Sequence, residues 1–128
     1  MRVANFAAVV AALSVAVAAP ASAQSEATLD TFVTRANRIP LNPLGALRPD
    51  ARRLMSEANA AFTTVGAETR AARASGRRPA ACPPGEVQVN PRQLLAFLNG
   101  IPQPRRARMS VADGIREWMA SRYPCPAV

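Results

Sequence analysis

The sequence predicts a small all-α domain, and three observations support this prediction. Four stretches place apolar residues at helical spacing, and segments rich in proline and glycine separate these stretches. No strand-like alternation is longer than Val87-Gln88-Val89, and no internal repeat is present. We therefore expect a four-helix domain in which a single disulfide, between Cys82 and Cys125, clasps the C-terminal helical hairpin.

Residues 1–23 have the pattern of a secretory signal peptide. Arg2 supplies a basic start, an uncharged stretch follows over 6–19, and Pro20-Ala21-Ser22-Ala23 matches a small-x-small cleavage site. The uncharged stretch is shorter than the roughly 20 residues that a membrane-spanning helix needs. We expect cleavage near Ala23, leaving a single helical domain at 24–128 that does not span a membrane. Its expected location is the periplasm or the cell exterior.

The first helix is expected over 24–38. Its apolar residues form one stripe at helical spacing, which consists of Leu29, Phe32, Val33 and Ala36. Pro40 ends the helix, because the residue before a proline is pushed out of the α region. The connector at 41–49 carries several leucines, so we expect an ordered loop that lies across the core.

The longest helix is expected from Pro49 or Asp50 to about Ala74. Gly66 interrupts its pattern and indicates either close helix packing or a slight break. Gly76 is well placed as a left-handed cap. The predicted buried face has helical spacing and consists of Leu54, Met55, Ala58, Ala61, Phe62 and Val65.

Two shorter helices are expected near the C-terminus. Asn90 as N-cap and Pro91 at the first position begin one of them, which ends at Asn99-Gly100. After a proline-containing loop at 101–109, the last helix is expected over 110–122. It begins with a capping-box pattern, Ser110 followed by Asp113, and Pro124 ends it.

The two cysteines are expected to form a structural disulfide. Exported proteins meet an oxidising compartment, where two lone cysteines usually pair. If the last two helices form an antiparallel hairpin, Cys82 and Cys125 lie together at its outer end. A loop of this length corresponds to about 4 kcal/mol of stabilisation in the chain-entropy account. The alternative, a reactive thiol, would more often show Cys-x-x-Cys spacing or a histidine base, and the chain contains no histidine.

No set of residues predicts catalysis or a cofactor. The chain has no histidine for an N/S metal site and no glycine-rich phosphate loop. A carboxylate pair such as Glu57 and Glu68 stays open as a hydrolytic site, although a solvated helix face is the simpler interpretation. Only one Trp and one Tyr are available to stack bases. We expect a protein that is not an enzyme, holds no cofactor or metal, and does not bind nucleic acid.

The chain is strongly basic, with 16 Lys and Arg against 8 Asp and Glu and a formal charge of +8. Such a balance favours an anionic partner, although the absence of lysine and the abundance of alanine and proline also fit a GC-rich codon bias. Two arginine groups are the candidate partner-binding residues. One follows the long helix and includes Arg77 and Arg78 after Arg70 and Arg73. The stronger candidate lies in the second proline loop and comprises Arg105, Arg106 and Arg108.

The segment from Cys82 to Cys125 resembles the Tai family of immunity proteins, which protect bacteria from type VI secretion amidase effectors. The resemblance rests on Cys82-Pro83-Pro84, Gln93-Leu94, Leu98, Pro102 and the closing Tyr123-Pro124-Cys125. It implies a periplasmic, helical, disulfide-bonded protein, often a homodimer, that binds a peptidoglycan amidase and blocks its active site.

Two other functions stay open from the sequence. One is an exported structural or adaptor protein that shares only the disulfide-closed frame. The other is a cationic module that binds an anionic envelope polymer. Salt separates these functions, because a cationic module loses affinity steeply as salt rises whereas a protein interface with a buried apolar centre does not.

Overall fold

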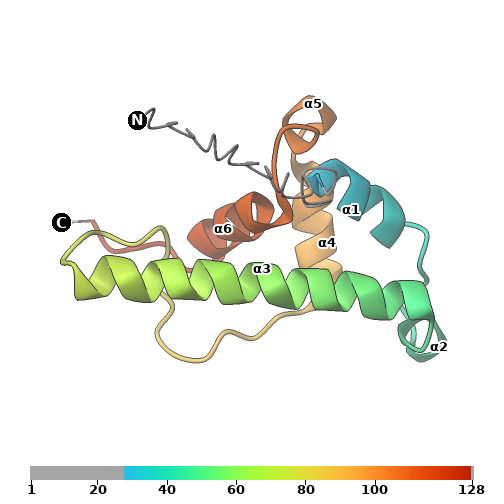
Figure 1. Ribbon diagram of the computed structural model, residues 1–128, viewed down its shortest axis with the longest axis horizontal. Coiled ribbons are helices and arrows are strands. Elements are labelled where there is room, and N and C mark those ends of the chain that lie inside the picture. Colours follow the sequence, from blue (N-terminus) through green and yellow to red (C-terminus); the bar gives the residue numbers. More distant parts are fainter. Residues whose placement is uncertain (1–27, 128) are drawn as a thin grey trace, which may run out of the picture.

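The computed structural model describes residues 28–127, which form six helices and no strand within that range. Four of them are the predicted helices, and two single-turn helices lie in the predicted connectors (Figure 1). In chain order they are α1 (Leu29–Ala36), α2 (Pro43–Ala46), α3 (Pro49–Ala74), α4 (Pro91–Gly100), α5 (Gln103–Arg106) and α6 (Val111–Arg122). The all-α prediction is confirmed. The predicted signal peptide at 1–23 and the start of the first predicted helix lie outside the described residues.

Helix α3 runs along the length of the molecule and supports the other helices (Figure 1). Helix α6 lies beside it and makes its largest interface with it. Helix α4 is oriented across α3, and α1 packs against α3, α4 and α6. The segment after α3 returns along the same helix before it enters α4 (Figure 1). Sγ of Cys125 lies 3.5 Å from the carbonyl oxygen of Pro79, which follows α3 in the sequence.

Side-chain caps explain where α4 and α6 begin. The side chain of Asn90 accepts hydrogen bonds from the backbone N–H groups of Arg92 and Gln93, which confirms it as the N-cap of α4. Ser110 and Asp113 form the predicted reciprocal capping box at the start of α6. At the end of α3, Gly76 has a φ of 70°, a left-handed conformation that glycine adopts without steric cost.

The core lies where α1, α4 and α6 meet. Leu29, Leu98 and Ile115 are fully buried there. Gly114 of α6 lets these helices approach closely, because a Cβ atom at this position would lie 2.8 Å from both Cδ atoms of Leu29 and 3.1 Å from Cδ2 of Leu98. The closeness of α6 to the core therefore depends on the absence of a side chain at Gly114.

The disulfide between Cys82 and Cys125 is confirmed, with a Cα–Cα distance of 4.8 Å. The backbone N–H of Cys82 also donates to the carbonyl of Tyr123 at 2.9 Å. The bridge closes the part of the chain that holds α4, α5 and α6. It fixes the end of α6 to the segment that leaves α3.

Ion pairs join helices that are distant in sequence. Arg35 of α1 makes a bidentate pair with Glu57 of α3, with N–O distances of 2.9 and 2.7 Å. Arg116 of α6 bonds Glu68 of α3 and Asp113 of its own helix. Bidentate arginine–carboxylate geometry adds directional specificity to each contact, so both pairs define how α1 and α6 sit on α3.

Two expectations about apolar residues are wrong. Met55 was expected on the buried face of α3, yet 57% of its surface is exposed in the part of the chain that the structure describes. The connector was expected to lie across the core, yet its leucines face outward. Leu41, Leu44 and Leu47 are 42%, 77% and 65% exposed. The connector folds instead into α2, where Asn42 caps the turn and Gly45 lies directly against the carbonyl of Pro40.

Among the helices of residues 28–127, none has the length and apolar character that crossing a membrane requires.

Candidate functional site

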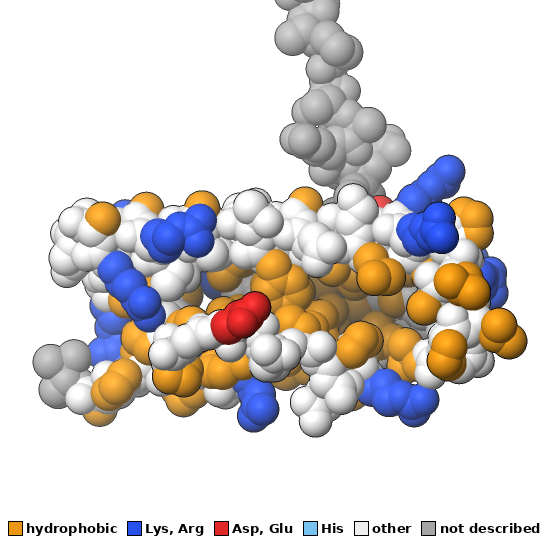
Figure 2. Space-filling view, turned by 90° about the horizontal axis from the view of Figure 1, so that it is seen from below, with side chains coloured by type: hydrophobic (Ala, Val, Ile, Leu, Met, Phe, Trp, Pro, Cys, Tyr) orange, Lys and Arg blue, Asp and Glu red, His pale blue; other side chains and the backbone are white. Residues whose placement is uncertain are grey.

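A long apolar groove lies beside α3 in the part of the chain that the structure describes. Its volume is about 1130 Å³, somewhat above the ~300–1,000 Å³ of typical small-molecule pockets. Figure 2 shows the groove as a hollow lined by hydrophobic side chains, with arginines around it. Helix α3 forms one wall, residues 83–92 form the opposite wall, and residues 39–43 close one end.

The α3 wall is a stripe of side chains at helical spacing. It begins near Met55 and continues through Phe62 and Gly66 to Arg73. A helix rises 1.5 Å per residue, so the stretch from Met55 to Arg73 covers roughly 27 Å. Gly66 does not break α3, which is continuous through it, and the nearest atom to a Cβ there would be Nη1 of Arg70 at 3.6 Å. Gly66 therefore leaves a shallow place in the groove wall.

Aromatic packing supports the floor of the groove. The ring of Phe62 meets the ring of Trp118 edge to face, with centroids 5.8 Å apart and an interplanar angle of 87°. Trp118 in turn meets Tyr123 in the same geometry at 6.3 Å. Because Trp118 and its neighbour Met119 are buried, the floor is continuous with the core.

The opposite wall is an extended segment. Val87 and Val89 both line the groove whereas Gln88 does not, which is the alternation of an extended chain. Residues 83–89 make no backbone–backbone hydrogen bond with another described residue. The disulfide at Cys82 and the cap at Asn90 therefore hold this wall from its two ends.

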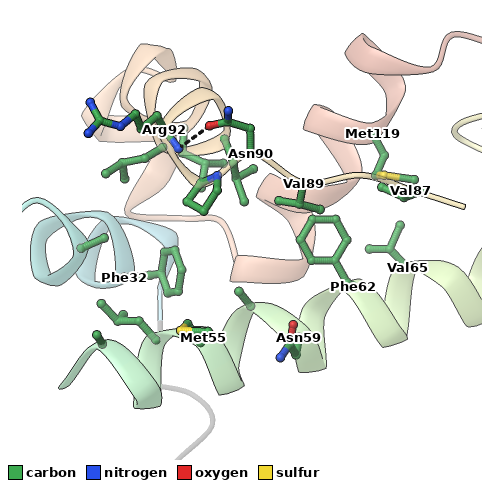
Figure 3. A pocket seen from close by; sticks show the side chains of 18 of the residues that line it. Phe32, Met55, Asn59, Phe62, Val65, Val87, Val89, Asn90, Arg92 and Met119 are labelled. Atoms are coloured by element: carbon green, nitrogen blue, oxygen red, sulfur yellow. Dashed lines mark hydrogen bonds between the residues drawn. The ribbon is translucent and has the colours of Figure 1, made fainter. Parts of the chain in front are cut away.

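The start of α4 closes the groove near the connector (Figure 3). Nη2 of Arg92 donates to the carbonyl of Leu41 at 2.9 Å and so ties α4 to the connector. Figure 3 shows Arg92 and Asn90 at the same end of the groove as Phe32 and Met55, with Val65 and Val87 toward the other end.

The charge around the groove is positive. Arg70, Arg73 and Arg92 are among its lining residues, and no Asp or Glu of the described chain lines it. Glu86 lies on the extended wall between two lining residues. It is also the one carboxylate in residues 28–127 that forms no ion pair with a described arginine.

The stronger candidate group for partner binding, Arg105, Arg106 and Arg108, lies outside the groove. Its three arginines make different contacts. Arg106 bonds Asp30 at 3.1 Å and also donates to the carbonyls of Asn99 and Ile101. Its side chain is only 15% exposed, so it holds α5 against its neighbours. Arg105 pairs with Glu117 and stays half-exposed. Arg108 is exposed and has no described carboxylate partner.

The other candidates, Arg77 and Arg78, are exposed at the end of α3. Nε of Arg77 donates to the Ser75 hydroxyl, and Nη2 of Arg78 donates to the carbonyl of Cys125 at 3.2 Å. They border a smaller hollow of about 330 Å³. The structure therefore places the five candidate arginines outside the groove, on two separate surfaces.

The perturbed titratable groups belong to the ion-pair framework. Hydrogen bonding to Glu57 raises the pKa of Arg35, and hydrogen bonding to Glu68 raises the pKa of Arg116. The same pairing with Arg116 lowers the pKa of the Glu68 carboxyl. The pKa of Asp113 is also lowered, chiefly because its carboxylate accepts the backbone N–H of Ser110. None of these four groups lines the groove.

The groove is suited to binding by shape, apolar contact and charge. Its lining combines hydrophobic side chains with arginines and a few amides. In residues 28–127, no three His, Cys, Asp or Glu side chains come together as a metal site. Comparison of the chain with family models, curated proteins and solved structures finds no match.

Proposed function

We propose that this chain is a non-enzymatic binding protein that takes up part of another protein in the groove beside α3. The observation that carries the proposal is the uncovered apolar stripe of α3, where Met55 is 57% exposed and Phe62 lines the floor. Apolar surface of this extent on a soluble protein commonly marks an interaction site. The rigid support beneath it, from Trp118 and the disulfide, favours binding without rearrangement of the floor.

The target in this proposal is an envelope hydrolase of the peptidoglycan amidase type, which the chain would inhibit as an immunity protein. Support comes from the resemblance of the segment from Cys82 to Cys125 to the Tai immunity proteins. The motifs at the two ends of this segment contain the two cysteines of the disulfide. A disulfide of this kind forms in an oxidising compartment, which agrees with export to the periplasm. On this account, inhibition follows from occupation of the groove by a part of the hydrolase.

Capture from the envelope fraction of the host tests this function. The oxidised chain is immobilised, washed at low and at high salt, and the retained proteins are identified by mass spectrometry. One stoichiometric envelope hydrolase that survives high salt, and whose activity falls when the chain is added, is the expected result. The molar ratio in the purified complex also tells whether a monomer or a homodimer binds.

Matched variants show whether capture uses the groove. Met55→Asp and Val89→Asp each place a charge on the groove wall at an exposed position, so folding should survive. Leu44→Asp and Leu47→Asp are the controls, because these leucines are exposed but do not line the groove. The proposal is supported if the two groove variants lose the hydrolase and the two control variants retain it. Equal loss with both pairs, or no hydrolase at all, contradicts it.

A cationic module that binds anionic envelope polymer is the second candidate. It is favoured by the arginines of residues 28–127 that have no carboxylate partner there, among them Arg52, Arg53 and Arg108. Its signature is heterogeneous anionic material that washes away as salt rises, because exposed charges are screened. An adaptor of unassigned role would give neither the hydrolase nor this material.

A further inference from the structure

We infer that the occupant of the groove is an amphipathic helix that has an apolar stripe in its middle and acidic residues near both ends. This inference rests on the proposed function, since it specifies which part of a partner protein enters the groove. It follows from how charge and apolar surface are arranged along α3.

Positive charge lies toward both ends of the groove and apolar surface lies between them. Arg92 is at the end marked by Phe32 and Met55 (Figure 3), and Arg70 and Arg73 follow on α3 beyond Val65. From Met55 to Arg70 the axis of α3 rises roughly 22 Å. A ligand that neutralises both ends must therefore carry negative charge at two places about that far apart.

The middle of the groove is suited to the apolar face of a helix. The stripe on α3 carries small residues at Ala58 and Gly66 and large ones at Met55 and Phe62, and small residues allow a second helix to come close. Methionine adapts its shape to a partner. An amphipathic helix that binds in an apolar groove presents its own anchors at i, i+3, i+4 and i+7, and the elongated apolar wall of α3 offers a surface along which such a row of anchors packs.

A single-chain anionic lipid satisfies these features less well. Its one headgroup would neutralise one end of the groove and leave the positive charge at the other end without an anionic partner. Small ligands are also usually enclosed over most of their surface, whereas the wall at Met55 and Val89 is exposed to solvent. The arrangement of charge at two ends therefore favours an acidic helix.

Binding of synthetic peptides to the oxidised chain tests the inference. The probe is a fluorescent helical peptide of about 18 residues, close to 27 Å long, with leucines on one stripe and glutamates in its first and last turns. A matched peptide has lysines in place of the glutamates, and a second has the same composition in scrambled order. Fluorescence anisotropy gives the three dissociation constants. We expect the acidic peptide to bind at least about tenfold more tightly than either control peptide.

Variants locate the site of the peptide. Arg70→Gln combined with Arg92→Gln should weaken the acidic peptide about tenfold and reduce its dependence on salt. The control is Arg52→Gln combined with Arg53→Gln, because both arginines lie on α3, are exposed, and do not line the groove. Circular dichroism and a thermal melt confirm that each variant is folded.

Each other outcome overturns the inference. Equal binding of the acidic and basic peptides excludes the charge pattern, and no binding of any peptide excludes a helix. Displacement of a bound acidic peptide by a fatty acid at lower concentration assigns the groove to lipid. If the envelope hydrolase is captured through Met55 and Val89 while the acidic peptide does not bind, the inference fails and the proposed function stands.

Discussion

Phe62 and Trp118 meet edge to face at 5.8 Å, and this contact joins the floor of the groove to the core. Phe62 is partly exposed to the groove, whereas Trp118 is buried beneath it on α6. Aromatic pairs in this geometry contribute about 0.5–1.5 kcal/mol beyond the area that they bury. The position of Phe62 in the groove floor therefore depends on the packing of α3 against α6.

Reduction of the disulfide should destabilise the fold strongly. The bridge closes a long loop, and the chain-entropy account gives about 4 kcal/mol as its contribution to the free energy of unfolding. Urea titrations of the oxidised chain and of the Cys82→Ser, Cys125→Ser double variant measure the difference. A loss below about 1 kcal/mol would mean that the backbone contact from Cys82 to Tyr123 holds this region without the bridge.

Gly114→Ala should lower stability by about 1–3 kcal/mol. The new methyl group would lie 2.8 Å from the Leu29 side chain and 3.1 Å from that of Leu98, and both leucines are fully buried, so the core must shift to admit it. Gly100→Ala is the control, since a Cβ there would meet no atom within 4 Å. Equal melting temperatures for the two variants would show that the core accommodates the methyl group.

Asp113→Asn should change how stability depends on pH. The pKa of Asp113 is lowered in the folded chain, first by the backbone N–H of Ser110 and then by Arg116 and the Ser110 hydroxyl. Its contribution is therefore present above its ordinary pKa of about 4 and is lost as the pH falls through the folded value. The gap in stability between wild type and variant should shrink as the pH falls below about 4. Thermal melts across this range measure it.

Glu86→Gln serves as the control for this prediction, because Glu86 forms no ion pair with a described arginine. A gap between wild type and Asp113→Asn that stays constant down to pH 2 would contradict the role of the Asp113 carboxylate.

Arg106→Gln should destabilise the fold, whereas Arg108→Gln should not. Arg106 donates to Asp30 and to two backbone carbonyls in a mostly buried position, so its loss should cost about 1–3 kcal/mol. Arg108 is exposed, and its replacement should stay within about 0.5 kcal/mol. Chemical denaturation of both variants checks the contrast. Equal effects would mean that the contacts of Arg106 add nothing to stability.

Local signals predicted the frame of the fold well. The caps at Asn90 and Ser110, the left-handed Gly76 and the pairing of Cys82 with Cys125 were all predictable, because each depends on a few neighbouring residues or on the only available partner.

The groove was not predicted, because helical periodicity tells which face of α3 is apolar but not whether another helix covers it. Met55 directly follows buried Leu54 and both residues line the groove, yet Met55 is 57% exposed. The alternation at Val87-Gln88-Val89 was a usable signal of an extended wall. Clustering along the sequence also grouped Arg106 with Arg108, although tertiary contacts give them different roles.

The most direct test of the account is hydrogen exchange on the complex of the oxidised chain with its captured envelope hydrolase. Binding in the groove predicts new protection at residues 84–92 and little change at residues 103–109. In the unbound chain, residues 83–89 make no backbone–backbone hydrogen bond with another described residue. Protection confined to residues 103–109, around Arg105 and Arg108, would place the interface on the other surface and contradict the account.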